Sequence, residues 1–159
     1  MSKSPDCQAN PTLARKLNVE VTALLAELAA EIPFFFFSTD MVFDGRKGNY
    51  VEADAVSPLS VYSETKVAAE QIVLANSRHT VIRTSLNGGT SPTGDRGFNE
   101  QIRRAWESGQ TPNFFSDEFR NPIPAVVTAR ATWELLQKKQ TGLFHVAGAE
   151  RLSRAEIGA

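Results

Sequence analysis

The sequence predicts an α/β layer fold with a mainly parallel sheet. Segments with a helical repeat of apolar residues alternate with short apolar segments along the chain, which is typical of this class. The short segments are apolar throughout, as in strands that are covered on both faces of a parallel sheet. With 159 residues, 42% of them hydrophobic and 22% charged, the chain suffices for a single domain with a core, predicted over residues 1–159.

The first helix is predicted over residues 11–30. Asn10 supplies an N-cap side chain, and Pro11 suits the first helical position. Residues at helical spacing give this helix one apolar face, made of Leu13, Leu17, Val21, Leu24, Leu25 and Leu28. Pro33 breaks the helix, and the four consecutive phenylalanines at 34–37 predict a strand buried on both faces.

The remaining elements continue the alternation. A polar loop over residues 44–58 leads to a helix that Pro58 opens and that ends near Asn76, packed inward by Val61, Val67, Ala68, Ile72 and Val73. β-Branched residues predict a strand over 79–85, and a flexible loop follows over 87–97. The pattern then predicts a helix over 98–108, a short strand over 111–116, a helix over 126–138, a strand over 142–148 and a last helix that reaches Ala159.

Composition excludes several classes of function. The formal net charge of −1 argues against a nucleic-acid or anionic-membrane partner. Cys7 is the only cysteine and lies in a terminus expected to fray, which fits a reducing, cytoplasmic setting without a disulfide. No apolar run approaches the roughly 20 residues of a membrane span, and no signal peptide is recognised. The two histidines have no partners at metal-ligand spacing, so no metal site is expected.

One candidate for acid–base chemistry stands in the segment YSETK. Tyr62 and Lys66 are four residues apart and share one face of the predicted helix. A free tyrosine has a pKa of about 10, and a nearby ammonium lowers that pKa toward the range useful for proton transfer at neutral pH. By itself the pair is more simply explained as two solvated helix residues, because such spacing arises often by chance.

The end of the phenylalanine strand strengthens this candidate. The segment STDMVFDG places two hydroxyls and an acid, Ser38, Thr39 and Asp40, directly after the strand. Open α/β sheets bind their ligands at the carboxyl ends of their strands. Thr39 at this edge and Tyr62 at the start of the next helix are therefore expected to converge on one substrate oxygen.

These motifs resemble the extended short-chain dehydrogenase/reductase superfamily. STDMVFDG followed by YVEADAVSPLSVYSETKVAAEQ is similar to the pattern of the dTDP-4-dehydrorhamnose reductases, and RTS, DEFRNPI and GLFHVAGAERLSR are similar to their later segments. Ser63 and Met41 depart from that pattern, which more often has a glycine and an aromatic residue there. The resemblance covers nearly the whole chain from Pro11 onward.

The resemblance implies a role for each motif residue. Tyr62 would donate a proton to the keto oxygen of a sugar nucleotide, Lys66 would lower the pKa of Tyr62 and hold the nicotinamide ribose, and Thr39 would bind the substrate oxygen. The cofactor would be NADPH or NADH. The resemblance implies two further residues near the cofactor, Ser38 and Arg83. It implies six near the substrate: Asp40, Met41, Val42, Asp117, Arg120 and Asn121.

The resemblance also implies which reaction is favoured. Related 4,6-dehydratases carry Thr-Asp-Glu, whereas Met41 follows Thr39 and Asp40 here, so simple carbonyl reduction is expected. The acids Glu52 and Asp54 are expected to have a structural role. Three alternatives stay open, namely another sugar-nucleotide epimerase, a non-catalytic regulatory subunit like that of methionine adenosyltransferase, and an inert fragment.

The fold implied is a partial Rossmann-like, doubly wound parallel sheet. It would lack the first three strands and the glycine-rich loop that holds a dinucleotide, with substrate-side segments from about residue 87 onward. The strand at 34–37 would then lie at an open sheet edge. Self-association or a homodimer through that edge is expected, together with weak cofactor binding and no measurable turnover by this chain alone.

Overall fold

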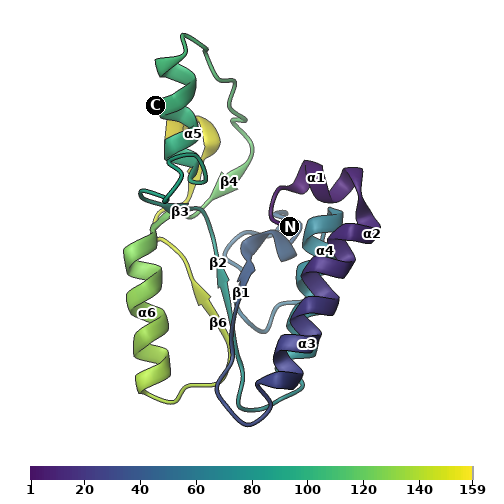
Figure 1. Cartoon of the computed structure of the whole chain (residues 1–159). Helices are drawn as coiled ribbons and strands as arrows, with labels where there is room; N and C mark the ends of the chain where they lie inside the picture. Colours follow the sequence, from purple (N-terminus) through teal and green to yellow (C-terminus); the bar gives the residue numbers. More distant parts are fainter. Residues whose placement is uncertain (159) are drawn as a thin grey trace. The chain divides into compact units, whose positions relative to one another are not determined.

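The computed structural model describes residues 1–158 and divides the chain into two compact units. The first unit comprises residues 1–83 and 134–145, and the second comprises residues 84–133 and 146–159. Figure 1 shows the α/β character of the chain, with the helices and strands labelled. The candidate catalytic residues Thr39, Tyr62 and Lys66 all belong to the first unit.

The first unit contains a parallel sheet, as the sequence predicts. Its strands are β1 (Phe35–Thr39), β2 (Thr80–Thr84) and β6 (Gly142–Val146), in the order β1-β2-β6 (Figure 1). The central strand β2 is buried along its whole length, as expected for a β-branched segment between two neighbours. The outer position of β1 agrees with the open edge expected for this strand.

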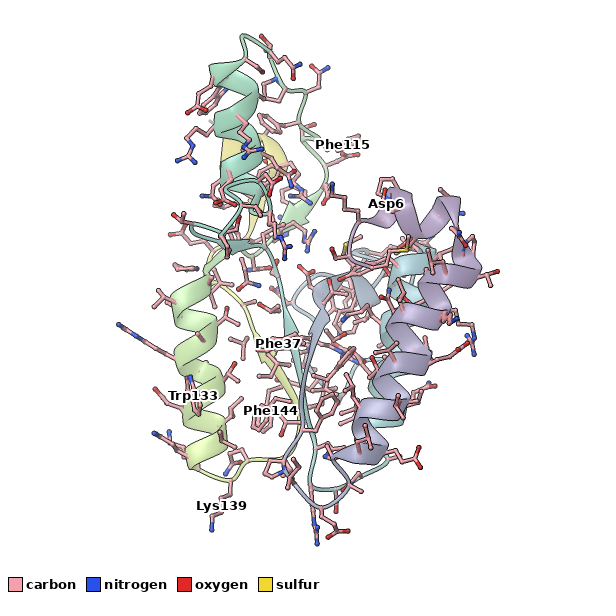
Figure 2. The ribbon with its side chains drawn as sticks, viewed as in Figure 1. Asp6, Phe37, Phe115, Trp133, Lys139 and Phe144 are labelled. Atoms are coloured by element: carbon pink, nitrogen blue, oxygen red, sulfur yellow. The ribbon has the colours of Figure 1, made fainter. Side chains whose placement is uncertain are left out.

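The phenylalanine strand is less buried than the sequence predicts. Phe35 and Phe36 are half-buried, and Phe37, labelled in Figure 2, is 45% exposed, so burial on both faces is wrong for this strand. Full burial begins only at Ser38 and Thr39, where the strand meets α4. At its outer position the strand has a neighbour on one side only, and the exposed Phe37 indicates that one face of the strand is not fully covered.

The N-terminal segment is helical from Ser4 onward. The helices α1 (Ser4–Ala9), α2 (Pro11–Arg15) and α3 (Val21–Leu28) are joined at Asn10 and by a π-helical turn, η1 (Lys16–Glu20). The side chain of Asn10 accepts a hydrogen bond from the Leu13 amide at 3.0 Å, which confirms the predicted cap. The frayed terminus was a wrong expectation, because Cys7 lies on α1 and is fully buried.

The apolar face of this helical segment points outward. Its large residues are 39–74% exposed: Leu13, Leu17, Val21, Leu24, Leu25 and Leu28. The buried residues on the opposite side are small or β-branched: Ala14, Val19, Thr22 and Ala26. Small side chains allow the segment to approach α4 (Val61–Leu74) closely, and the two lie side by side in Figure 1. Asn18 donates to the Thr65 hydroxyl across that contact at 3.0 Å.

Helix α4 is bound to the sheet by a buried ion pair. Its fully buried residues include Glu70 and Val73, whereas Val61, Val67, Ala68 and Ile72 of the predicted inward set are half-buried. The Glu70 carboxylate accepts two hydrogen bonds from the Arg83 guanidinium of β2, at 3.0 and 2.7 Å. Both side chains are at most 6% exposed, so the two charges are shielded from water. In this bidentate ion pair, or fork, each charge is stabilised by the other instead of by solvent.

The second unit is built from short strands and helices. Its pairs are β3 (Asn87–Gly88) with β5 (Ile123–Pro124), parallel, and β4 (Phe119–Arg120) with β7 (Leu152–Ser153), antiparallel. Its helices are α5 (Phe98–Glu107) and α7 (Arg154–Gly158), and α6 (Ala125–Gln137) begins in it. The predicted strand at 111–116 is wrong, because those residues form no ladder. Ala159 of the predicted last helix lies outside the described residues.

The loop before α5 is organised around one carboxylate. Glu100, which is 1% exposed, accepts hydrogen bonds from the amides of Ser91, Arg96 and Gly97 and from the Ser91 hydroxyl, at 2.6–3.1 Å. The Gly97 amide and the Ser91 hydroxyl lower the pKa of Glu100 to about 2. The turn is therefore fixed by the ionised form of this side chain.

Trp106 and Trp133 are 56% and 63% exposed, so neither belongs to the core (Trp133 is labelled in Figure 2). Within residues 1–158, no helix has the length and apolar character needed to cross a bilayer.

The buried ion pair gives a first prediction. Glu70→Ala leaves the Arg83 guanidinium buried without its carboxylate and should lower the free energy of unfolding by about 3–5 kcal/mol, measured by urea denaturation. Replacing both partners by methionine should recover most of that loss. Glu31→Gln, which breaks the exposed ion pair with Arg78, is the matched control and should change stability by about 1 kcal/mol or less. Equal losses in the single and double variants would contradict this account.

The loop carboxylate gives a second prediction, on pH. The pKa of Glu100 is about 2 in the folded chain against an ordinary 4.5, so its stabilisation is fully present above pH 4.5 and is lost as the pH falls toward 2. Glu100→Gln should therefore lower the melting temperature at pH 7, and the difference from the parent should shrink between pH 4.5 and 2. Glu107→Gln on the same helix, in an exposed pair with Arg103, should show no such trend.

Candidate active site

The candidate site begins where β1 ends. The Thr39 hydroxyl accepts a hydrogen bond from the Met41 amide at 3.2 Å and donates to the Asp40 carboxylate at 3.2 Å. Thr39 thereby caps the short 3₁₀ helix η2 (Asp40–Val42), with its side chain fixed at the carboxyl end of the strand. Val42 is fully buried, and Met41 is half-buried.

Ser38 precedes Thr39 and presents an unusual hydroxyl. The residue is 4% exposed, and its Oγ has no hydrogen-bond partner among the residues that the structure describes. A buried hydroxyl without a partner carries an energetic penalty, so it is a polar group that a bound molecule could satisfy. The lack of a partner is consistent with the cofactor contact predicted for Ser38.

The start of α4 is fixed by two serines. The Ser60 hydroxyl accepts from the Ser63 amide at 3.2 Å, and the two hydroxyls lie 2.9 Å apart. Ser63 is 1% exposed, so the residue that departs from the reductase pattern fits because Ser60 satisfies its hydroxyl. The helix therefore begins at Val61, one turn later than the proline signal indicated.

Lys66 connects α4 to the end of β1. Its ammonium donates to the Phe37 carbonyl at 2.6 Å and lies 4.1 Å from the centre of the Phe36 ring. Burial lowers the pKa of Lys66 to about 8, and the nearby Glu70 carboxylate opposes that shift. This hydrogen bond ties the Lys66 side chain to the backbone of β1, one residue before Ser38. Tyr62 lies one turn earlier on α4 and is half-buried.

A residue that the sequence interpretation missed supports the turn that carries Tyr62. Asn18 in η1 donates to the Thr65 hydroxyl at 3.0 Å, and that hydroxyl donates to the Tyr62 carbonyl at 2.7 Å. This chain of hydrogen bonds links the N-terminal helical segment to the first turn of α4. The signal in the sequence was an asparagine between two apolar residues, Leu17 and Val19.

The loop after η2 is ordered by its acids, which confirms their structural role. The Glu52 carboxylate accepts from the His145 amide at 2.8 Å, and this hydrogen bond lowers the pKa of Glu52. Asp54 accepts from Lys47 at 2.5 Å and from the Val51 amide at 2.8 Å. The acids therefore tie the loop to itself and to β6.

Arg83 is placed beneath this loop. Its guanidinium, already paired with Glu70, lies 5.0 Å from the centre of the Phe43 ring and 3.4 Å from the His145 ring nitrogen. Phe43 in turn stacks on Tyr50, with ring centres 4.2 Å apart. In this arrangement Arg83 supports β2, α4 and the loop, and its predicted contact with a cofactor stays a prediction.

The three residues predicted near the sugar nucleotide lie in the second unit. Asp117 is exposed, and Arg120 on β4 is 8% exposed, with Glu118 at 3.5 Å. The Asn121 side chain donates to the carbonyls of Gly148 and Glu150, at 3.2 and 3.1 Å. A side chain on Gly148 would collide with the Pro122 carbonyl, so this tight packing requires the glycine. Asn121 therefore secures a turn, and its role toward a substrate stays a prediction.

Comparison with known proteins relates the chain to a group of reductases. It is 33% identical over 158 residues to the probable low-salt glycan biosynthesis reductase Agl14 of Haloferax volcanii, covering 96% of this chain and 53% of that protein. It is 30% identical over 165 residues to methionine adenosyltransferase 2 subunit beta of Rattus norvegicus, covering 98% and 49%. The chain thus spans about half the length of the curated relatives it matches.

Solved structures share the fold. A hypothetical dTDP-4-dehydrorhamnose reductase from Sulfolobus tokodaii superimposes with a TM-score of 0.89 at 32% identity, covering 99% of this chain and 56% of that one. A dTDP-4-dehydrorhamnose reductase from Bacillus anthracis, solved with NADP, has the same fold, with a TM-score of 0.91 at 21% identity over 99% and 57% of the two chains. The family model described as the RmlD substrate binding domain matches residues 3–159, and the chain belongs to this family.

Proposed function

We propose that this chain forms the catalytic part of a nicotinamide-dependent reductase acting on a nucleotide-activated 4-keto-6-deoxysugar, of which dTDP-4-dehydrorhamnose is the best candidate. One observation carries the proposal most directly: the Lys66 ammonium donates a hydrogen bond to the Phe37 carbonyl of β1, one residue before Ser38 and two before Thr39. The family and the reductase relatives support the same reaction type. We place this reaction in the cytoplasm, because the single cysteine fits a reducing compartment.

Each catalytic residue then has a defined task. Tyr62 gives a proton to the substrate oxygen, and Thr39 donates a hydrogen bond to the same oxygen once its hydroxyl proton turns away from Asp40. Lys66, with a pKa of about 8, is mostly charged at neutral pH, and its charge favours the tyrosinate that forms on proton transfer. The Ser38 hydroxyl is free to bond to a ligand once the site is filled.

The cofactor, NADPH or NADH, would supply the hydride. Lys66 and Ser38 are the residues of this chain that fit its ribose and nicotinamide side, because one is a cation and the other an unsatisfied buried hydroxyl. The pyrophosphate requires a glycine-rich turn at a helix N-terminus, and the sequence contains no such motif. The residues of this chain would therefore contact the ribose and nicotinamide of the cofactor, and not its pyrophosphate.

A second candidate function has a specific observation in its favour. The similarity to methionine adenosyltransferase 2 subunit beta extends over 98% of the chain, so a non-catalytic role beside a synthetase is a defined alternative. The presence of Thr39, Tyr62 and Lys66 does not discriminate between the two functions, because a regulatory subunit can retain the same three residues. Co-purification with a synthetase, without turnover of any keto sugar, would support the regulatory role, whereas turnover supports the enzyme.

Loss of the tyrosine hydroxyl is the central test of the proposed reaction. In a fusion to the part of the Sulfolobus tokodaii reductase that this chain does not match, Tyr62→Phe should reduce keto-sugar turnover by roughly 10²–10⁴-fold. Binding of the cofactor, measured by calorimetry, should persist, because the phenol contributes mainly to proton transfer. Lys66→Ala should weaken both. Reduction by Tyr62→Phe at nearly the parental rate would rule out this assignment.

A complementary prediction concerns the 159-residue chain by itself. Without a glycine-rich turn in its sequence, it should bind NADPH and NADH only weakly and show no measurable reduction. Calorimetric titration with each cofactor, with the active fusion as the positive control, checks this. Binding in the micromolar range by the chain alone would reveal a phosphate site elsewhere in its sequence.

A further inference from the structure

The amine of Lys66 has different surroundings from a typical surface lysine. Its nitrogen donates to the Phe37 carbonyl at 2.6 Å and lies 4.1 Å from the centre of the Phe36 ring. Lys47 also lies beside an aromatic ring, but its nitrogen is 2.5 Å from the Asp54 carboxylate and its side chain is 58% exposed. The partner of Lys47 is therefore an anion, whereas the partners of Lys66 are a neutral carbonyl and an apolar ring.

The carboxylate nearest to Lys66 along α4 is already occupied. Both oxygens of Glu70 accept hydrogen bonds from Arg83, at 3.0 and 2.7 Å. The Phe37 carbonyl, in contrast, accepts equally well from an amine without charge, which still carries two N–H groups. A neutral Lys66 therefore keeps its anchor on β1 and gains a lone pair. Burial lowers the pKa of Lys66 to about 8, so about one chain in ten holds the neutral amine at pH 7.

The amine is also within reach of a small molecule. Lys66 is only half-buried, and Phe37, whose carbonyl holds the nitrogen, is 45% exposed (Phe37 is labelled in Figure 2). A lysine in apolar surroundings that lower its charge is the side chain that forms Schiff bases with carbonyl compounds. The setting of Lys66 thus combines a fixed nitrogen, an accessible lone pair and an apolar wall for the carbon chain of a ligand.

We propose that Lys66 is a covalent binding site for small aldehydes and ketones, which its amine captures as an imine. The nitrogen attacks the carbonyl carbon and forms a C–N bond, and both amine protons pass to the carbonyl oxygen, which departs as water. The step is reversible by hydrolysis and needs no oxidant or reductant. It goes beyond the proposed reduction, in which Lys66 acts through its charge and forms no bond to carbon.

Reductive trapping on the 159-residue chain tests this site. Benzaldehyde is the probe, and cyanoborohydride delivers a hydride to the imine carbon, which leaves a stable benzylamine that peptide mass spectrometry assigns to each lysine. At pH 7, Lys66 should be labelled at least about tenfold faster than Lys47. The neutral fraction at a pKa of about 8 is roughly 300-fold that at the ordinary 10.5. The lower nucleophilicity of a less basic amine offsets part of this advantage, as it does for thiols.

The pH dependence of the ratio between the two labelling rates provides a second measurement. Below pH 8 the ratio should be constant, because both neutral fractions then rise tenfold per pH unit. Above pH 8 it should fall, because Lys66 is already mostly neutral there. Lys66→Arg keeps the charge without the nucleophile, so it should abolish labelling at this position and leave the rate at Lys47 unchanged. Circular dichroism verifies the fold of this variant.

Labelling of Lys66 no faster than that of Lys47, or a ratio that stays constant up to pH 10, would overturn the proposal. Neither cofactor nor sugar is present in this experiment, so its result is independent of the proposed reduction. An active fusion whose Lys66 is unreactive would overturn this inference alone. A reactive Lys66 in a fusion without turnover would support the inference and contradict the proposed reduction.

Discussion

The buried fork between Glu70 and Arg83 is the interaction on which the first unit depends. It fixes α4 on the central strand, and Lys66 lies one turn away on the same helix. Because two buried charges tolerate little misalignment, the fork determines both the rotation and the height of α4 over the sheet. The position of the Lys66 ammonium at the Phe37 carbonyl follows from that geometry.

The same fork affects the chemistry available at Lys66. Burial disfavours the ammonium, whereas the Glu70 carboxylate favours it, and the resulting pKa is about 8. With a pKa of about 8, Lys66 is close to the point where it changes protonation state at neutral pH. A lysine fully paired with a carboxylate would keep its charge far above neutral pH and would be less sensitive to a bound ligand.

Much of this arrangement is predictable from the sequence, and the exceptions have physical causes. The alternation of elements and the cap at Asn10 depend on local patterns, which the sequence contains in full. The motif STDMVFDG and the Tyr62–Lys66 pair are recognisable in the same way, because each is a local pattern in the sequence. The fork between Glu70 and Arg83 was not predicted, because it joins residues thirteen apart whose pairing depends on how a helix docks on a strand. The role of Glu100 was missed because its partners are backbone amides.

The leucine stripe shows the limit of periodicity most clearly. An apolar stripe predicts that one side of a helix is removed from water. The stripe does not indicate which surface, if any within the chain, covers that side. In residues 11–28 the side that contacts α4 is made of alanine and threonine, and Asn18 and Thr65 join the two helices by a hydrogen bond. Close approach through small residues and one polar bridge thus holds the segment in place. The large apolar residues stay exposed, so the helical segment supports the turn that carries Tyr62 without burying its own apolar stripe.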